Sequence, residues 1–266
     1  MTQQFQFDVL VLFGSSSDSY VYEPLCELLQ GNGLKVDFEI ISAHRNPDRL
    51  EERLSLQDYA CVIAGAGISA HLPGVVASKV QVPVYGIPVE AQFDGLDAMM
   101  SIQMMPRGVP VLACGPRRWS LFVPFLKAVK TLLGTWTRSI EICVASDVKD
   151  SKAFLKEFAR LSNTADERGI SMVIVDQPSK TQPAIHFVTK EEDLSDNPFG
   201  IHVPLLESGE RAKIETAVRC FQWTQKGGLW VGVNNSINAL HFICKALVPN
   251  DRLPPIYHVG SVKNIL

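Results

Sequence analysis

The stretch FDVLVLFGSSSD, residues 7–18, decides the fold class, because an apolar run ends there in a polar turn that begins with glycine. Residues Phe7–Phe13 are typical of a buried strand, and the spacing over 20–29 predicts a helix after the turn. The alternation of strands and helices that follows indicates an α/β fold with a parallel sheet covered on both faces. We expect strands at 36–41, 59–64, 82–87 and 109–114, and helices at 47–56, 71–78, 94–100 and 121–133.

The second half of the chain repeats part of this pattern. Residues 139–147 resemble 9–18, an apolar run followed by serine and aspartate, and 228–233 resemble 108–113. Between them we expect a helix at 151–161, a strand at 172–175, a long loop at 177–197 and a strand at 199–204. This order indicates a diverged tandem repeat. We therefore divide the chain into a catalytic domain (1–137), a degenerate repeat (138–248) and a tail (249–266).

Composition excludes several classes of protein. The net charge of −3 over 266 residues provides no basic footprint for nucleic acid. No apolar run reaches the ~18 residues of a membrane span, and the first residues lack the pattern of a signal peptide. The six cysteines are dispersed, without the short spacing of a zinc site. We expect a cytoplasmic protein without a metal, whose two halves pack together because no flexible linker joins them.

The sequence Ser42-Ala43-His44-Arg45 is the strongest candidate for chemistry. It follows a predicted strand, where a parallel sheet presents its loops to ligands. Histidine changes charge near neutral pH, and arginine has a fork of donors suited to phosphate. The pair predicts a proton carrier beside an anion ligand.

Two further loops are expected at the same edge of the sheet. Residues 14–18 combine backbone N–H groups with serine hydroxyls before a helix, which suits an anion, although Ser and Asp there are also common helix caps. Residues 64–74 (AGAGISAHLPG) contain small residues that allow close approach of a ligand. Taken alone, His71 is better interpreted as a packed core histidine. Neither a P-loop nor a dinucleotide fingerprint is present.

Four motifs together resemble the family of N5-carboxyaminoimidazole ribonucleotide mutase and AIR carboxylase: residues 14–18, 42–47, 64–74 and 101–111. The resemblance covers about residues 7–115 and implies a flavodoxin-like three-layer αβα sandwich, here duplicated with a degenerate second copy. It implies an octamer of single-domain subunits with shared sites, and no cofactor or metal. It further implies that His44 is the general acid/base and that Ser15, Ser17, Asp18 and Arg45 bind the phosphate and ribose. The pocket would be lined by Ser42, Ala43, Gly65, Ala66, Gly67, His71 and Leu72.

Three segments depart from the family pattern: Ile68-Ser69 adds bulk, the Gln-Met-Pro motif has an additional methionine at 104–105, and 115–119 replaces the usual closing segment. The family's asparagine-alanine pair occurs instead at Asn238-Ala239 in the second half. We hypothesise that the first repeat keeps the catalytic loops while the second supplies Asn238 as a further substrate-binding residue. The assembly would then be a homotetramer of tandem chains that imitates an octamer.

The expected function is the mutase reaction, in which a carboxyl group moves from the exocyclic nitrogen of an aminoimidazole ribonucleotide to ring carbon 4. Its partners would be the ribonucleotide and CO2. One alternative is AIR carboxylase, which adds free CO2 to the same carbon. A second is a non-catalytic nucleotide-binding homologue, and the least specific is a flavodoxin-like FMN protein.

Overall fold

The computed structural model describes residues 5–248, and the tail expected at 249–266 lies outside the described residues. The first half forms five parallel strands, of which four are largely buried, mostly apolar runs, whereas the strand Val36–Ile40 is only partly buried. The strands are β1 (Phe7–Phe13), β2 (Val36–Ile40), β3 (Tyr59–Ala66), β4 (Val84–Pro88) and β5 (Leu112–Cys114). The connecting helices are α1 (Ser19–Gly31), α2 (Pro47–Ser55), α3 (His71–Lys79), α4 (Leu96–Gln103) and α5 (Phe122–Leu132). The predicted alternation of strands and helices is confirmed.

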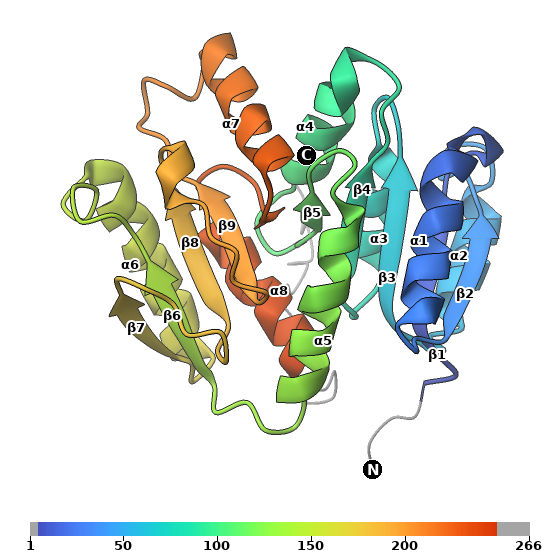
Figure 1. The fold of residues 1–266 in the computed structure, drawn as a ribbon, viewed down its shortest axis with the longest axis horizontal. Helices are drawn as coiled ribbons and strands as arrows, with labels where there is room; N and C mark the ends of the chain where they lie inside the picture. Colours follow the sequence, from blue (N-terminus) through green and yellow to red (C-terminus); the bar gives the residue numbers. More distant parts are fainter. Residues whose placement is uncertain (1–4, 249–266) are drawn as a thin grey trace, which may run out of the picture.

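The second half forms five more strands in the same sheet (Figure 1). They are β6 (Ser139–Cys143), β7 (Ser171–Val175), β8 (Ala184–Val188), β9 (Gly200–Pro204) and β10 (Leu229–Trp230). Three helices accompany them: α6 (Lys152–Glu167), α7 (Ile214–Lys226) and α8 (Ser236–Leu247). The expected long loop at 177–197 is wrong, because it contains β8. That strand lies within a stretch whose other residues are mostly polar, so its buried run did not stand out in the sequence.

The two halves share one topology. The complete sheet has the order β2-β1-β3-β4-β5-β10-β9-β8-β6-β7, so each half reads 2-1-3-4-5 from its outer edge to the junction. This is the order of flavodoxin-like folds. All strand pairs are parallel except β5 with β10, which pair antiparallel at Ala113 and Trp230. The shared order agrees with a duplicated unit, and the domain boundaries themselves stay a prediction.

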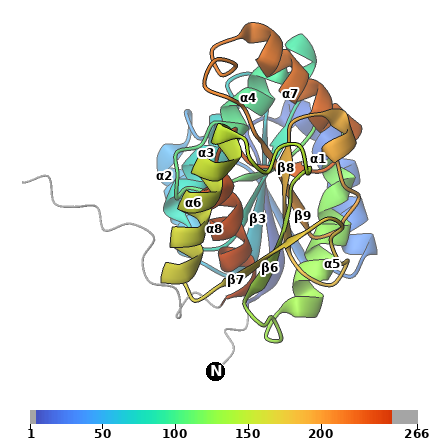
Figure 2. The ribbon, with the colours of Figure 1, turned by 90° about the vertical axis from the view of Figure 1, so that its left-hand side faces the viewer.

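Helices cover both faces of the sheet. Figure 2 shows α1 and α5 on one side, and α2, α3, α6 and α8 on the other. At the junction, Tyr85 of β4 contacts both halves: its ring centroid lies 5.1 Å from those of Phe122 of α5 and Phe242 of α8. The two halves therefore share one core, which confirms that they pack together.

Backbone contacts at the junction are repeated in the two halves. A Cβ atom on Gly115, after β5, would lie 2.0 Å from the carbonyl oxygen of Thr224, and one on Gly232, after β10, would lie 2.4 Å from that of Gln103. Only glycine permits such an approach. The segment after β5 thus packs against the end of α7, and the segment after β10 packs against the end of α4.

Five of the six cysteines are buried, and Cys26 is partly buried. Their interpretation as small packed residues is confirmed for these five, and burial raises the pKa of Cys143 to about 12. Among residues 5–248, no helix has the length and apolar character needed to cross a bilayer.

Candidate active site

The loops after β1, β2 and β3 meet at one edge of the first half-sheet. β1 lies between β2 and β3, so successive strands are added on opposite sides of it and the strand order reverses there. Open α/β sheets bind ligands at such a switch point. The backbone N–H of Gly14 donates to the carbonyl of Gly65 at 3.3 Å, which joins the first loop to the third. Arg45 Nη2 donates to the carbonyl of Gly14 at 3.2 Å, which joins the second loop to the first.

His44 and His71 form a hydrogen-bonded pair. His44 Nε2 lies 2.9 Å from His71 Nδ1, and the rings meet edge to face with centroids 5.0 Å apart. Because a proton between two ring nitrogens is donated by one and accepted by the other, the pair can hold and transfer a proton. Both side chains are exposed, so the interpretation of His71 as a packed core histidine is wrong.

The serine-rich loop after β1 is internally bonded. Ser15 Oγ accepts from the backbone N–H of Ser17, as a helix cap does, and lies 2.8 Å from Ser17 Oγ. Ser17 Oγ donates to Asp18 at 3.1 Å. Partial burial raises the pKa of Asp18, an effect that the Ser17 hydrogen bond opposes. The capping explanation therefore holds for Ser15, whereas the Asp18 side chain makes no cap to α1.

The remaining predicted residues differ in accessibility. Ser42 Oγ accepts from the backbone N–H of Arg45 at 3.3 Å, and Ala43 is partly buried beside it. Gly65 and Ala66 are buried at the end of β3, and the Leu72 side chain is 2 % exposed in the core. A Cβ on Gly65 would lie 2.3 Å from the Phe13 ring. The packing of this ring is therefore enough by itself to explain the glycine. Gly67 is partly exposed at the start of the next turn.

Asn238 is not among the residues brought together at this edge. It is 2 % exposed in the first turn of α8, and its amide is bonded to the backbone of residues 106–109. Met105 in the same loop lies against Gly74 of α3, where a Cβ would be 3.0 Å from its Sδ. The second half thus supports the loop that packs on α3, and a binding role for Asn238 stays a prediction.

The first half of the chain matches known sequences. The AIR carboxylase family model matches residues 8–116. N5-carboxyaminoimidazole ribonucleotide mutase of Methanocaldococcus jannaschii is 41 % identical over 107 residues, which are 40 % of this chain and 68 % of that protein. The chain belongs to the AIR carboxylase family.

Other members of the family differ in their names. A protein of Haemophilus influenzae with the same mutase name is 41 % identical over 114 residues, covering 41 % of this chain and 70 % of its own length. Chloroplastic phosphoribosylaminoimidazole carboxylase of Vigna aconitifolia is 44 % identical over 104 residues, covering 38 % of this chain and 19 % of its own length. The crystal structure of Treponema denticola PurE aligns with 60 % of this chain and 96 % of its own at 22 % identity, with a TM-score of 0.41.

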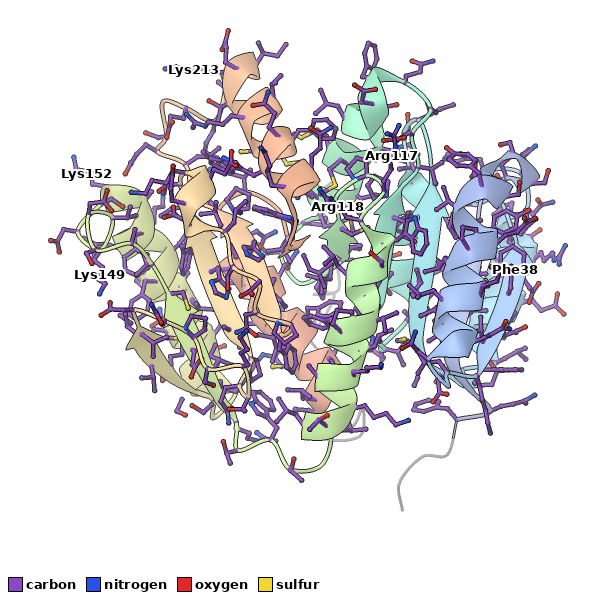
Figure 3. All side chains as sticks on the ribbon, viewed as in Figure 1. Phe38, Arg117, Arg118, Lys149, Lys152 and Lys213 are labelled. Atoms are coloured by element: carbon purple, nitrogen blue, oxygen red, sulfur yellow. The ribbon has the colours of Figure 1, made fainter. Side chains whose placement is uncertain are left out.

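The sequences Ser-Ala-His-Arg and Ala-Gly-Ala-Gly of the first half do not recur in the second half, and ion pairs occupy the corresponding loops. Asp147, which follows β6 as Asp18 follows β1, pairs with Lys190 at 3.3 Å, and Lys149 pairs with Asp176 at 3.3 Å. Figure 3 shows Lys149 at the left-hand edge of the molecule, well away from Arg117 near the middle of the view. The charged side chains of these loops are therefore paired with each other.

One group beside the family's loops was missed in the sequence. Arg117 Nε donates to Glu90 at 2.6 Å, and Tyr20 donates its hydroxyl proton to the Glu90 carbonyl at 3.0 Å. Burial raises the pKa of Tyr20, with a further contribution from the charges of Asp18 and Glu90. Figure 3 shows Arg117 between α4 and the start of α5. The sequence signal that could have indicated this group is Tyr20, a polar aromatic residue two positions after Asp18.

A cavity of about 380 Å³ opens elsewhere, where the start of α5 faces the chain around β9 and β10. Its lining includes Leu121, Asn197 and Leu229 and none of the predicted site residues. It lies where residues 189–199 join β8 to β9 without an α-helix, unlike the corresponding connection through α3 in the first half.

Proposed function

We propose that this chain is a mutase of purine biosynthesis that converts N5-carboxyaminoimidazole ribonucleotide to 4-carboxy-5-aminoimidazole ribonucleotide. The observation that carries the proposal is the 2.9 Å hydrogen bond between His44 and His71, in loops that match relatives named for this reaction. A paired histidine at the ligand-binding edge supplies the proton transfers that the reaction needs.

His44 is the general acid and base in this proposal. The bond between the exocyclic nitrogen and the carboxyl carbon breaks, CO2 is released, and His44 gives its proton to the nitrogen. Ring carbon 4 then attacks the same CO2, and His44 removes the proton from that carbon to restore the aromatic ring. The hydrogen bond to His71 orients the imidazole for both steps, and retention of CO2 beside the ring supplies proximity.

The phosphate and ribose bind to Ser15, Ser17, Asp18 and Arg45. Arg45 is held beside the Gly14 carbonyl, where its guanidinium can also face a phosphate at the start of the helical segment. Asp18 accepts hydrogen bonds from ribose hydroxyls. Small residues around the histidines, Ala43, Ala66 and Gly67, leave room for the imidazole and CO2.

The active assembly is a homo-oligomer, most simply a tetramer of tandem chains with four sites. Large exposed side chains in the first half support this proposal, because Tyr20 in α1, Ile68, Phe93 and Met104 are each more than half exposed. Such exposed apolar side chains are typical of a surface that another subunit covers. Residues 1–137 are the catalytic domain, and 138–248 a repeat whose Asn238 supports the site.

A paired substrate assay tests the proposal. Purified protein is given either the N5-carboxylated ribonucleotide without bicarbonate or the uncarboxylated ribonucleotide with bicarbonate. Turnover in the first reaction supports the mutase, and turnover only in the second identifies AIR carboxylase. His44→Asn should lower kcat at least 100-fold, within the range for loss of a general acid/base. No turnover of either substrate by the wild-type protein would overturn the enzymatic assignment.

Arg45→Gln separates binding from chemistry. It should raise KM more than it lowers kcat, because the residue contacts the phosphate rather than the reacting carbon. Arg49→Gln is the matched control, since Arg49 lies four residues further on and pairs with Glu39 at 3.0 Å on the outer surface. An equal effect of the two substitutions would contradict the role of Arg45.

A further inference from the structure

The turn between β3 and α3 has an unusual backbone. Ile68 has φ of 55° and Ala70 has φ of 29°, both on the left-handed side that non-glycine residues rarely adopt. The conformation costs an L-residue roughly 1–2 kcal/mol, and it is least favourable for a β-branched side chain. The Ile68 side chain is 58 % exposed, so its own packing contributes little to holding the turn. Other contacts must stabilise it.

Two hydrogen bonds close this turn. The N–H of Ala70 donates to the carbonyl of Gly67 at 3.1 Å within the turn itself. From outside, Ser101 Oγ donates to the carbonyl of Ser69 at 2.5 Å. Ser101 lies in α4, where a serine often bonds a carbonyl of its own helix, as Ser78 does with Val75 in α3. Ser101 instead connects two segments that are 32 residues apart.

The turn leads directly to the histidine pair. His71 is the first residue of α3, and its Nδ1 meets His44 Nε2 at 2.9 Å. The body of α3 is fixed by buried side chains such as Leu72 and Val76. The exposed ring of His71 has no comparable packing. Its position therefore depends on the backbone of the turn and on the hydrogen bond to His44.

We propose that Ser101 is a positioning residue for the His44–His71 pair. Its hydroxyl holds the Ser69 carbonyl, keeps Ile68 and Ala70 in the left-handed conformation and thereby sets the distance between the two rings. The kinetic part of this inference rests on the proposed mutase function. Without the hydroxyl the turn relaxes toward ordinary φ values, and His71 moves away from His44. The phosphate loop at 14–18 does not share this contact, so substrate binding should be preserved.

Three variants test the kinetic consequence. Ser101→Ala should lower kcat about tenfold and leave KM within about twofold, a split typical of lost orientation rather than lost binding. Ser101→Thr keeps the hydroxyl and should restore kcat to within about threefold of wild type. Ser78→Ala is the matched control, because it removes a serine hydrogen bond that stays within α3. An unchanged kcat in Ser101→Ala, or failure of threonine to rescue, would overturn the proposal.

Nuclear magnetic resonance of the histidine rings tests the same contact without any turnover. The ring C–H signals of His44 and His71 are assigned with His44→Asn and His71→Asn and then compared between variants at one fixed pH. We expect both signals to shift in Ser101→Ala but not in Ser78→Ala. Identical spectra of the two rings in Ser101→Ala and wild type would contradict the positioning role, even if neither ribonucleotide is a substrate. If the alanine variant does not fold, Ser101→Cys, a weak donor of similar size, should show the same shifts and loss of kcat.

Discussion

Asn238 Oδ1 accepts a 2.7 Å hydrogen bond from the backbone N–H of Gly108, although 130 residues separate the two. Its Nδ2 donates to the carbonyl of Pro106 at 3.0 Å, so both ends of one buried amide fix the loop before β5. Asn235 adds a hydrogen bond to the Met105 carbonyl, and Arg107 pairs with Glu157. The second half therefore holds the loop that packs on α3, the helix that begins with His71.

Asn238→Ala should lower the free energy of unfolding by about 2 kcal/mol, because it leaves a buried N–H and carbonyl without partners. Chemical denaturation measures the change. Asn163→Ala, an exposed position in α6, should change stability by less than about 0.5 kcal/mol. Similar losses at the two positions would show that the Gly108 contact is not the cause.

Ile68→Gly should raise Tm by about 2–4 °C, because glycine adopts a φ of 55° without the cost that isoleucine bears. Differential scanning calorimetry measures the shift. Ile214→Gly, at an exposed position in α7, should instead lower stability by up to about 1 kcal/mol. A fall in Tm for Ile68→Gly would mean that the turn carries no releasable strain.

Stability should fall as the pH drops below about 6.5, because two stacked core histidines stay neutral in the folded state. Burial lowers the pKa of His186 to about 3, assisted by the charge of His202, and lowers that of His202 to about 4. The unfolded chain binds protons at about 6.5, so at pH 5 each histidine costs about 2 kcal/mol. The loss should level off once the pH is below the folded-state pKa.

His186→Leu removes one of these groups and should flatten the pH dependence of the denaturation midpoint between pH 6.5 and 4. His202 remains as an internal reference. It accepts from the Ser195 N–H at 3.1 Å and lies 3.2 Å from the Leu229 carbonyl, which requires the neutral ring. An unchanged slope in His186→Leu would exclude His186 as a source of the acid sensitivity.

Arg53→Met should destabilise the protein by about 3 kcal/mol, because the guanidinium is 6 % exposed and forms ion pairs with three carboxylates around β2. Its Nε lies 2.8 Å from Glu39 and its Nη1 lies 2.9 Å from Asp58, with Asp37 as the third partner. Arg49→Met removes an exposed partner of the same Glu39 and should cost less than about 1 kcal/mol. Equal costs in urea denaturation would contradict the special role of burial.

The strands and helices of the first half were predictable because each buried strand is a continuous apolar run that ends at a glycine or polar turn. The run at Phe7–Phe13 shows this most clearly. β8 escaped prediction because its residues lie within the stretch 177–197, whose other residues are mostly polar and therefore indicated a loop. The continuation of the sheet through Ala113 and Trp230 depends on a tertiary pairing of two very short strands, for which the sequence has no local signal.

The candidate site was predictable as a set of loops but not as a set of contacts. Strand order brings residues 14–18, 42–45 and 64–71 to one edge, and their motifs were visible. The pairing of His44 with His71 could not be inferred, because a histidine beside alanine and leucine is also typical of a core. Ser101 bonds a backbone carbonyl, a kind of partner that leaves no pattern in side-chain chemistry. Asn238 was singled out through its asparagine-alanine pair, but its bond to the Gly108 N–H could not be predicted for the same reason.

The antiparallel pairing of β5 with β10 joins two flavodoxin-like units that belong to one chain, so their association is intramolecular. Two separate subunits would meet at a frequency set by their concentration, whereas units on one chain face each other at a high effective concentration at any dilution. Such a pair cannot exchange its members or form with the wrong copy. In the tandem arrangement proposed above, the second unit needs no working site of its own, and its loops hold internal ion pairs such as Asp147 with Lys190.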